Sequence, residues 1–587
     1  MSRKQRRRQE KLARTEAAKQ SGNNPEDALR IAGHFFQSGK LDQAIKILEG
    51  ARHHNPEHFE VAHGLAIIHA TQGDLDGALA LFEKAVAIRP GDAEAQFNLG
   101  LALTEKGRPD EAIAAYRRSL ENNPHEEAAL INLGNVFNDV KDFTGAADCF
   151  RRALEIKPDN AMAHTNLGNV LVELERFDAA FASYRKAIHI NPSLAEAHVC
   201  LGNAFKECDK LEEAIASQQQ ALALEPDHAG AHYNLGVALQ ALGRLDEADA
   251  RYRKAIAIDP DDADAHHNLG MVLLSLGNFE EGWREFSWRW KTSQFSSESR
   301  EFNNPPWEGE ALAGKQILVW EEQGVGESLL FAGLISELVQ LGAEVSVACE
   351  PRLAPLFARS FPETACIPVT DPIQAATGKQ DFDCHAPMAD LGRWLRPDAA
   401  SFHSPPGAYL AADPDHSAAL RGRYLEKGGD LLVGLAWFSK SPHYAKRKSM
   451  TLDDLGPVLG IPGITFVDLQ YGDTEAARAA FTARTGIGII HDDGVDQMAD
   501  LDAFAAQVAA LDAVVTISNT TAHMAGGLGV ATLLMLDTSP IWYWRTEGED
   551  SPWYPLVKLF RQRQAGDWGE VVGRVEDAVK GILADRR

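Results

Sequence analysis

The stretch INLGNVFNDVKDFTGAADCFRRALEIKPDNAMAHTNLG, residues 131–168, carries Asn-Leu-Gly at 132–134 and again 34 residues later at 166–168. The same period runs through a set of prolines and a set of alanines: Pro56, Pro90, Pro124, Pro158, Pro192, Pro226 and Pro260, with Ala44, Ala78, Ala112, Ala146, Ala180, Ala214 and Ala248. Asn-Leu-Gly also occurs at 98–100, 234–236 and 268–270, and Cys-Leu-Gly stands at 200–202. Small residues let two antiparallel helices approach closely and a proline ends the second helix, so the pattern predicts a solenoid of helix pairs.

This pattern resembles the tetratricopeptide repeat (TPR), and it predicts eight units over residues 25–296. The last unit departs from the pattern, because Gly282 stands at the alanine position, Arg289 replaces the next alanine and no proline closes the unit. Its segment EGWREFSWRW, residues 281–290, adds three tryptophans. A terminal repeat either presents a polar cap or docks on a neighbour, and large aromatic residues favour docking.

After residue 300 the period ends and short apolar runs alternate with helix-like segments. The runs are KQILVW (315–320), AEVSVAC (343–349), LLVGLAW (431–437), ITFVDLQ (464–470), DAVVTIS (512–518) and VATLLML (530–536). Alternation of this kind predicts parallel sheets covered by helices on both faces. A Pro-, Ala- and Ser-rich stretch before residue 425 divides the series in two.

The predicted fold is therefore an α-solenoid followed by an α/β domain of two doubly wound halves with a cleft between them. We place a basic tail at 1–24, the solenoid at 25–296, and the two halves at 297–425 and 426–587.

The charge of the chain limits the classes of partner. A formal net charge of -26 argues against broad binding to nucleic acid or anionic membranes. The first twenty residues carry the opposite, positive charge, with eight Lys or Arg against two Glu. Such a tail either contacts an acidic partner or is a solvated chain end, and we favour the second interpretation.

We expect a cytoplasmic protein. No apolar segment follows the basic residues as in a secretory signal, and no apolar run approaches the roughly 20 residues that span a bilayer. The six cysteines show no CxxC spacing, which is typical of scattered reduced thiols.

Beyond the repeats, the segments LAGKQILVWEEQGVGESLLFAGLI (312–335), VGLAWFSKSPHYAKRKSMTL (433–452), FVDLQYGD (466–473), ISNTTAHMAGGLGVATLLML (517–536) and DSPWYPLVKLFRQ (550–562) stand in this order. Together with the repeats they resemble bacterial TPR-linked glycosyltransferases. These are similar to heptosyltransferases of the GT-B fold and, more distantly, to the O-linked N-acetylglucosamine transferase. The architecture is also similar to that of bacterial flagellin glycosyltransferases, which bind their acceptor through TPRs.

The resemblance implies a nucleotide-sugar donor bound between the two halves as a co-substrate, with no other cofactor. It also implies a protein acceptor, of which flagellin is the most specific candidate, and by analogy a nonulosonic acid such as CMP-pseudaminic acid as donor. No Asp-x-Asp motif stands out in the sequence, so we expect transfer without a metal ion.

The first candidate site is the turn between the strand at 317–320 and a helix expected near Ser328. Gly324 and Gly326 would let the backbone approach a sugar or phosphate, or would serve packing alone. The resembling families usually have Asp, proposed as the catalytic base, where this chain has Glu327. Glu327 is thus either that base or an acid that favours the helix N-terminus. The neighbouring Glu322 and Gln323 would hydrogen-bond sugar hydroxyls or form a polar loop edge.

The second candidate site lies at the start of the helix expected after the run DAVVTI. Asn519, Thr520 and Thr521 would bind the phosphate of a nucleotide sugar through hydroxyls and free N–H groups, or would simply cap the helix. His523 would bond phosphate or ribose, or would be a packed structural residue. Gly526, Gly527 and Gly529 indicate a close helix approach or a bound ligand.

The third candidate site follows the run LLVGLA in a basic segment with His443, Lys446, Arg447 and Lys448. Positive charge there would stabilise a departing phosphate, or would be a solvated loop. We predict donor contacts from Ser439 and Lys440. Lys448 stands where the group usually has Arg, which removes the bidentate geometry of a guanidinium.

The acceptor side is predicted from a row of amides at the sixth position of successive repeats. These are Asn98, Asn132, Asn166, Asn234 and Asn268, and Cys200 interrupts the row. A similar asparagine ladder holds extended peptide in the N-acetylglucosamine transferase, and the resemblance carries that role to these residues. The alternative is a consensus Asn that faces water.

Three functions remain open at this stage. The first is transfer of a sugar to Ser or Thr of a protein, the second is transfer to a lipopolysaccharide-type glycan, and the third is a TPR adaptor or chaperone with a decayed transferase domain. The oligomeric state is not indicated by the sequence.

Overall fold

A computed structural model describes residues 24–292, 302, 304–322, 324–369, 382–402, 407–440 and 445–586. The basic tail predicted at 1–24 therefore lies almost entirely outside the described residues. The chain divides into two compact units, and the division falls between Pro226 and Asp227, inside the repeat array. Each unit is described by itself.

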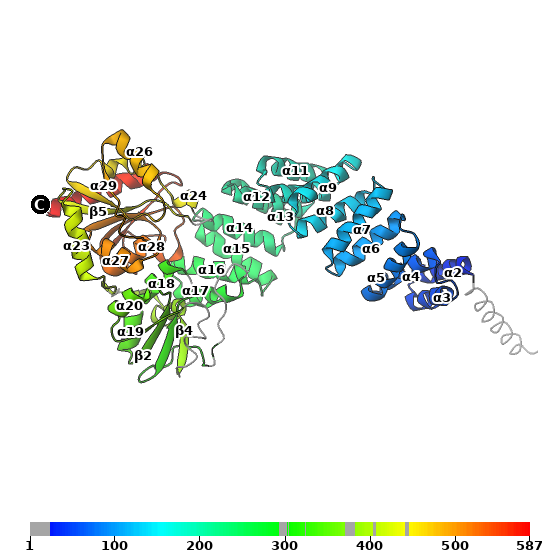
Figure 1. Ribbon diagram of the computed structural model, residues 1–587, viewed down its shortest axis with the longest axis horizontal. Coiled ribbons are helices and arrows are strands. Elements are labelled where there is room, and N and C mark those ends of the chain that lie inside the picture. Colours follow the sequence, from blue (N-terminus) through cyan, green and yellow to red (C-terminus); the bar gives the residue numbers. More distant parts are fainter. Residues whose placement is uncertain are drawn as a thin grey trace, which may run out of the picture. The chain divides into compact units, whose positions relative to one another are not determined.

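The first unit consists of paired helices, drawn in blue to cyan in Figure 1. In chain order they are α2 (Pro25–Gln37), α3 (Leu41–His54), α4 (Phe59–Gln72), α5 (Leu75–Ile88), α6 (Ala93–Glu105), α7 (Pro109–Asn122), α8 (Glu127–Asp139), α9 (Phe143–Ile156), α10 (Ala161–Glu173), α11 (Phe177–Ile190), α12 (Ala195–Glu207) and α13 (Leu211–Leu224). The predicted solenoid of helix pairs is confirmed.

The glycine of each Asn-Leu-Gly is required by the packing of the two helices of a repeat. A Cβ at Gly100 would lie 2.7 Å from the ring of Tyr116, and one at Gly168 would lie 2.5 Å from the ring of Tyr184. The alanines of the repeat pattern are buried for the same reason. Any larger side chain at these positions would push the two helices apart.

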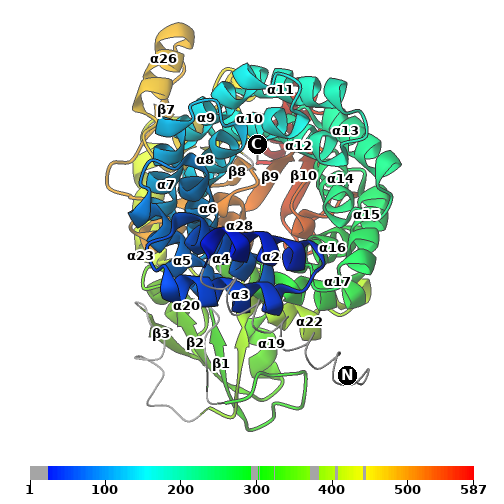
Figure 2. The ribbon, with the colours of Figure 1, turned by 90° about the vertical axis from the view of Figure 1, so that its right-hand side faces the viewer.

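The second unit begins with the last helix pairs of the array. These are α14 (Ala229–Ala241), α15 (Leu245–Ile258), α16 (Ala263–Leu276), α17 (Phe279–Phe286) and the short η1 (Ser287–Lys291). Strands and helices in alternation follow. The strands of the two sheets, green in one and yellow to red in the other, lie in separate parts of this unit (Figures 1 and 2).

The first sheet is parallel with the order β3-β2-β1-β4. Its strands are β1 (Gln316–Trp320), β2 (Glu344–Cys349), β3 (Ala365–Pro368) and β4 (Cys384–Pro387). The elements that accompany it are α18 (Val325–Ala332), α19 (Ile335–Gln340), α20 (Ala354–Ser360), η2 (Met388–Asp390), α22 (Leu391–Leu395) and η3 (Ala399–Phe402). The next helix, α23 (Pro414–Leu425), packs against elements of the second sheet.

The second sheet is also parallel, with the order β10-β9-β8-β5-β6-β7. Its strands are β5 (Leu431–Ala436), β6 (Ile464–Asp468), β7 (Ile489–Ile490), β8 (Ala513–Ile517), β9 (Ala531–Leu536) and β10 (Val557–Arg561). Its helices are α24 (Ala445–Lys448), α25 (Gly456–Leu459), α26 (Glu475–Thr485), α27 (Leu501–Ala509), α28 (Thr520–Leu528), η4 (Trp542–Trp544) and α29 (Trp568–Arg586). Two parallel sheets after the repeats confirm the predicted fold class.

The last repeat docks on the α/β region through its aromatic residues, as its sequence predicts. Trp283 is 2% exposed, and its indole N–H donates to the carbonyl of Arg396 at 2.8 Å. Its ring meets that of Trp542 edge to face, with the centroids 5.2 Å apart. A buried tryptophan whose N–H is satisfied contributes both apolar area and a defined orientation.

The residue that replaces the alanine of the last repeat makes a second contact. Arg289 is fully buried, and its guanidinium donates to the carboxylate of Glu322, after β1, at 2.7 and 3.0 Å, and to that of Asp390 at 2.6 Å. A further contact comes from Ser539, whose hydroxyl donates to the carbonyl of Gln240 at the end of α14, 2.6 Å away. The last repeats are thus part of the α/β unit rather than a separate array.

We expect Trp283→Ala to lower the free energy of unfolding of the second unit by about 3–5 kcal/mol, because it leaves a cavity and an unpaired carbonyl. Trp288→Ala is the matched control. Trp288 is only partly buried and stacks on His266 within the same repeat, with the ring centroids 3.9 Å apart. Urea denaturation followed by circular dichroism measures both variants, and equal losses would contradict the docking role of Trp283.

Candidate functional site

The second sheet has its switch point between β5 and β8, which are hydrogen-bonded neighbours. From β5 the chain continues toward β6 and β7, and from β8 it continues toward β9 and β10 on the other side. Ligands of open parallel sheets bind at such a point, beyond the carboxyl ends of the strands. The segment 437–440 follows β5 and Ser518–Thr520 follows β8, so two of the three predicted candidate sites lie at the carboxyl ends of neighbouring strands, on the two sides of the switch point.

The start of α28 is capped by Asn519, whose side-chain oxygen accepts from the N–H of Ala522 at 3.3 Å and from the hydroxyl of Thr516 at 3.1 Å. Its amide nitrogen is buried and has no hydrogen-bond partner among the described residues. Thr521 is buried and Thr520 is partly exposed. Asn519 therefore serves as the cap of the helix, and it also holds a donor that its surroundings leave unused.

Helix α18 of the first half packs against α28 of the second half. A Cβ at Gly326 would lie 3.3 Å from the ring of His523 and 3.7 Å from the hydroxyl of Thr520. The absence of a side chain at Gly326 thus eases this approach. A Cβ at Gly324, which precedes α18 and is exposed, would meet nothing within 4 Å. The contact brings the first two candidate sites together.

His523 is a packed residue with an aromatic environment. It is 2% exposed, its Nδ1 lies 2.9 Å from the hydroxyl of Tyr554, and its ring stacks on Trp544 with the centroids 5.0 Å apart. Burial, with the charge of Lys448, lowers the pKa of His523 to about 3. The imidazole is therefore neutral at physiological pH and is held in one orientation.

The glycines of α28 serve close packing. A Cβ at Gly526 would lie 2.6 Å from the ring of Tyr554, one at Gly527 would lie 2.6 Å from Leu410, and one at Gly529 would lie 2.8 Å from Ala408. Of the two explanations that the sequence left open, the close approach accounts for all three glycines.

Glu327 lies in the first turn of α18 and is half-buried. Burial raises the pKa of Glu327 to about 7, the negative charge of Glu322 raises it further, and the charge of Arg289 opposes the shift. A carboxyl with a pKa near 7 exchanges its proton at neutral pH, which suits a general base and costs stability in a purely structural acid.

Glu322 is not available to a sugar. It is 6% exposed, and its oxygens accept from Arg289 and, at 2.8 Å, from the N–H of Ala389. Burial raises the pKa of Glu322, against the effect of Arg289 and together with that of Asp390. Both sequence interpretations, the sugar contact and the polar loop edge, are therefore wrong for Glu322. Gln323 lies outside the described residues.

The segment after β5 holds Lys440 and Lys448 in different surroundings. Lys440 is exposed, its N–H donates to the hydroxyl of Tyr471 at 2.7 Å, and its ammonium lies 5.7 Å from the centroid of that ring. The N–H of Ser439 donates to the hydroxyl of Ser449 at 3.0 Å. Both residues thus shape the loop, and the ammonium of Lys440 is the part that reaches solvent.

Lys448, at the end of α24, is the lysine that approaches the helix α28. It is 5% exposed, and burial lowers its pKa to about 8, against the effect of Asp537 and together with that of Arg447. One carboxylate oxygen of Asp537, after β9, is buried and unbonded among the described residues. Sequence reasoning did not select Asp537, although it is the first polar residue after an apolar strand. His443 and the side chain of Lys446 lie outside the described residues.

The predicted ladder residues lie on the first helices of their repeats, with Asn98, Asn132 and Asn166 in the first unit and Asn234 and Asn268 in the second. Three amide nitrogens reach the preceding repeat: Asn98 to the ring of His63 at 3.0 Å, Asn166 to the oxygen of Asn135 at 3.1 Å and Asn268 to the hydroxyl of Tyr233 at 3.1 Å. Asn132 donates to the carbonyl of Ala128 at 2.9 Å. Three of these amides thus link successive repeats, and among the described residues no donor is bonded to the side-chain oxygens of the ladder.

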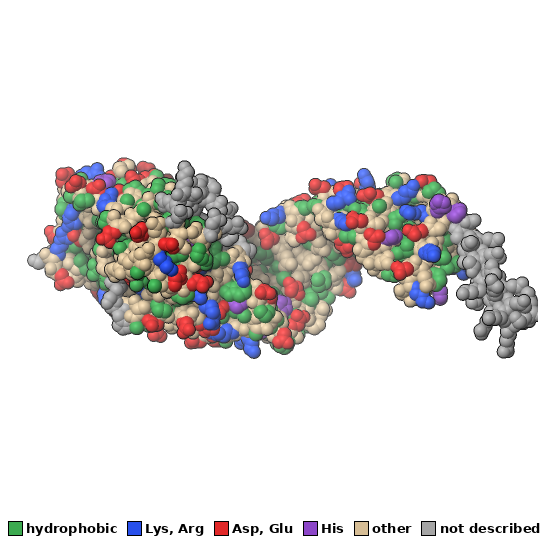
Figure 3. Space-filling model, turned by 90° about the horizontal axis from the view of Figure 1, so that it is seen from below, with side chains coloured by type: hydrophobic (Ala, Val, Ile, Leu, Met, Phe, Trp, Pro, Cys, Tyr) green, Lys and Arg blue, Asp and Glu red, His purple; other side chains and the backbone are tan. Residues whose placement is uncertain are grey.

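Charge is distributed rather than gathered on the face drawn in Figure 3, where acidic and basic side chains alternate. Within the described ranges, no three His, Cys, Asp or Glu side chains are grouped so as to hold a metal ion. None of the helices in those ranges has both the length and the apolar character of a bilayer crossing.

Comparison with known proteins identifies the repeats. Residues 57–124 match the tetratricopeptide repeat, and residues 134–174, 168–207, 202–243 and 238–277 match the TPR repeat. The protein FlbA of Caulobacter vibrioides (strain ATCC 19089 / CIP 103742 / CB 15) is 34% identical over 317 residues, which are 52% of this chain and 53% of FlbA. The chain thus spans about half the length of this relative.

Solved TPR structures match smaller parts of the chain. YrrB, a TPR protein described as having an unusual peptide-binding site, is 30% identical and covers 32% of this chain and 96% of its own, with a TM-score of 0.28. A thermophilic TPR protein of Thermus thermophilus, TTC0263, is 27% identical and covers 31% of this chain and 99% of its own, also with a TM-score of 0.28.

The raised pKa of Glu327 predicts that ionisation of this carboxyl lowers the stability of the folded protein. Because the folded pKa of about 7 exceeds the ordinary value of 4.5, the folded state binds more protons between these values and stability falls as pH rises through them. We expect the free energy of unfolding of the Glu327→Gln variant to equal that of the wild type at about pH 4. At about pH 8 it should be roughly 1–3 kcal/mol higher than that of the wild type.

Chemical denaturation at the two pH values measures this difference. Glu363→Gln, at an exposed glutamate of the same half, is the control and should leave the difference near zero at both. If Glu327→Gln gave the same stability difference at low and high pH, the raised pKa would be contradicted.

Proposed function

We propose that this chain is a glycosyltransferase, which moves a sugar from a nucleotide-sugar donor to a Ser or Thr hydroxyl of a polypeptide recruited by the TPR array. The observation that carries the proposal is the packing of α18 on α28. It brings Gly326 of one half beside Thr520 and His523 of the other, next to the switch point of the second sheet, and Glu327 is the next residue along α18.

The donor phosphates would rest at the start of α28. The N-terminus of a helix leaves backbone N–H groups without intrahelical partners, and its dipole favours an anion. The hydroxyl of Thr520 and the unused amide nitrogen of Asn519 add two more donors. The charge of the Lys448 ammonium contributes to the lowered pKa of His523. The same ammonium would supply the positive charge that a departing phosphate requires.

The acceptor hydroxyl would lose its proton to Glu327. As the new bond between the hydroxyl oxygen and the anomeric carbon forms, the bond from that carbon to the phosphate oxygen breaks, and the nucleotide leaves with the electron pair. A carboxylate whose pKa is about 7 is a stronger base than an ordinary glutamate and is still largely ionised above neutral pH. The residue is one methylene longer than the Asp of the resembling families, so it reaches further from the helix.

The TPR array would hold the acceptor through the free oxygens of the ladder amides. Amides bind peptide backbone whatever its side chains, which suits an acceptor in extended conformation. The resemblance in sequence favours flagellin as that acceptor and a nonulosonic acid, such as pseudaminic acid activated by CMP, as the sugar. We propose no cofactor besides this co-substrate and no requirement for a metal ion.

A TPR adaptor without catalysis is the second candidate, and one observation favours it. Glu322 and His523 are both engaged in packing, and the base and phosphate-binding positions carry Glu and Lys where the resembling families have Asp and Arg. In this case the array would bind partners and the second unit would provide a scaffold.

Donor binding distinguishes the two candidates. We expect titration calorimetry with sugar derivatives of UDP, GDP, ADP and CMP to detect binding of one of them. Lys448→Met should weaken that binding roughly ten- to a hundredfold, because it removes a charged partner of the phosphate. Lys440→Met, which changes an exposed lysine of the same segment, should have a much smaller effect. Binding of none of these compounds would favour the adaptor.

Transfer itself should depend on pH through Glu327. We expect the rate at limiting acceptor to rise tenfold per pH unit below about 7 and to level off above it, because only the ionised carboxylate accepts a proton. Glu327→Gln should lose roughly 10²–10⁴ in rate, and Glu327→Asp should restore part of it.

The acceptor for this assay would be identified by intact-mass comparison of surface and secreted proteins from cells with and without the chain. A mass difference on a protein names the acceptor and the sugar together. Loss of sugar label from glycolipid, with protein masses unchanged, would instead indicate transfer to a lipopolysaccharide-type glycan. A Glu327→Gln variant that sustains full modification would contradict the role of Glu327.

A further inference from the structure

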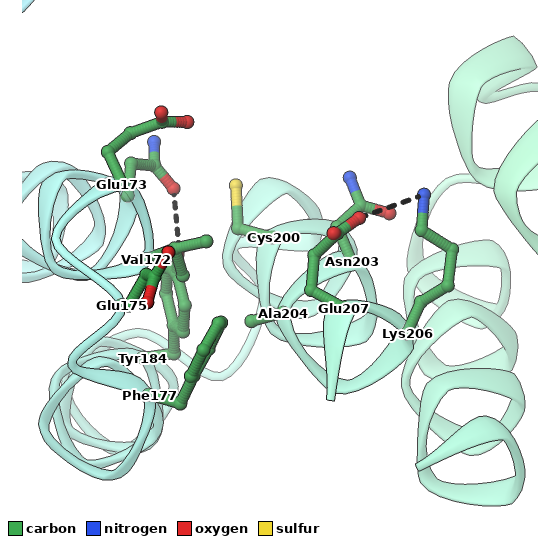
Figure 4. A pocket seen from close by; sticks show the side chains of 11 residues that line it. Val172, Glu173, Glu175, Phe177, Tyr184, Cys200, Asn203, Ala204, Lys206 and Glu207 are labelled. Carbon is green, nitrogen blue, oxygen red and sulfur yellow. Dashed lines mark hydrogen bonds and ion pairs between the residues drawn. The ribbon is translucent and has the colours of Figure 1, made fainter. Parts of the chain in front are cut away.

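The first unit contains a pocket of about 520 Å³ between the helices α10 and α12. Its lining residues come from α10, α11 and α12 and from the turn between α10 and α11. Pockets of this size accommodate small organic groups. Figure 4 shows the side chains around it.

The pocket lies where the ladder of amides is interrupted. Cys200 occupies the ladder position, and its thiol is shorter than the amide of Asn166 one repeat earlier. The thiol donates to the carboxylate of Glu196 at 3.4 Å, and burial raises the pKa of Cys200 to about 12. A neutral, short side chain thus leaves space where the neighbouring repeats carry an amide.

The pocket has apolar as well as polar walls. Val172, Phe177 and Ala204 line it, together with the ring of Tyr184, whose hydroxyl donates to the oxygen of Asn169 at 2.8 Å. That bond uses the polar end of the tyrosine, so the ring presents its face and edge. Such walls suit the methylene stem of a long side chain.

The rim of the pocket is acidic. Glu173, Glu175 and Glu207 face a single cation, Lys206, whose ammonium lies 3.6 Å from the carboxylate of Glu207. The carboxylates of Glu173 and Glu175 have no hydrogen-bond or ion-pair partner among the described residues, and in Figure 4 Glu173 and Glu207 appear on opposite sides of Cys200. The helices α10 and α12 both end at this rim, and the negative ends of their dipoles favour a cation.

We propose that this pocket binds the side chain of an arginine or lysine in a polypeptide that lies along the repeats. The stem would lie between Phe177 and Val172, and the charged group would meet Glu173. The inference rests on the proposed recruitment of a polypeptide by the array, but it does not depend on sugar transfer. The proposed ladder contacts would recognise only the backbone of the polypeptide, and the pocket would add a preference for one kind of side chain.

The test uses a short Gly/Ser/Thr peptide with one central arginine and a trifluoroacetyl label, and its twin with the neutral isostere citrulline. Broadening of the ¹⁹F signal by the full-length protein measures their binding. We expect the arginine peptide to bind roughly three- to tenfold more tightly, as for a partly exposed ion pair. Cys200→Asn, which continues the ladder and fills the pocket, and Glu173→Gln should each abolish this preference.

Asp139→Asn is the matched control, since Asp139 occupies the position of Glu173 one repeat earlier, is exposed and does not line the pocket. It should keep the preference. Equal binding of the two peptides, binding of neither, or a preference that survives both Cys200→Asn and Glu173→Gln would overturn the proposal. Glu327→Gln should also keep the preference, so a failure of sugar transfer would be seen separately from a failure of this pocket.

Discussion

The buried guanidinium of Arg289 is the interaction on which the arrangement of the second unit depends. It joins the end of the last repeat to Glu322, directly after β1, and to Asp390, after β4. These two strands are neighbours in the first sheet, so one side chain fixes the repeat against the switch point of that sheet. Burial raises the pKa of Glu327 to about 7, with a further contribution from the negative charge of Glu322 and against the charge of Arg289. Loss of Arg289 would leave both carboxylates without their cation, and an unpaired buried charge is strongly destabilising.

The second constraint is the close approach of α18 to α28. A Cβ at Gly326 would lie 3.3 Å from the imidazole of His523, and the aromatic residues Trp544 and Tyr554 contact that imidazole. The proposed donor and acceptor groups meet only because these two helices, which begin almost 200 residues apart in sequence, touch at their first turns. The candidate site is therefore a property of the interface between the two halves.

The strands that the sequence predicts are the inner strands of both sheets. Runs of apolar residues mark β1, β2, β5, β6, β8 and β9, whereas β3, β4, β7 and β10 carry no run that stands out, and all four are edge strands. An inner strand of a parallel sheet is covered on both faces and needs an apolar residue at nearly every position, as in β5 and β8. An edge strand is less covered: no residue of β3 is fully buried, and in β10 only Val557 and Leu559 are, so neither strand shows a continuous apolar run.

The sequence by itself determined the helical repeat, because a period of 34 residues with fixed glycine and alanine positions admits one packing of helix pairs. It also located the three candidate segments, because glycines and hydroxyls at the carboxyl ends of strands are visible in any one segment. It could not separate Lys448 from Lys440, remove Glu322 from the candidate site, or reveal the pocket beside Cys200. Those outcomes depend on which side chains from distant segments pack together and which charges then lie close to one another. Only the tertiary structure decides that.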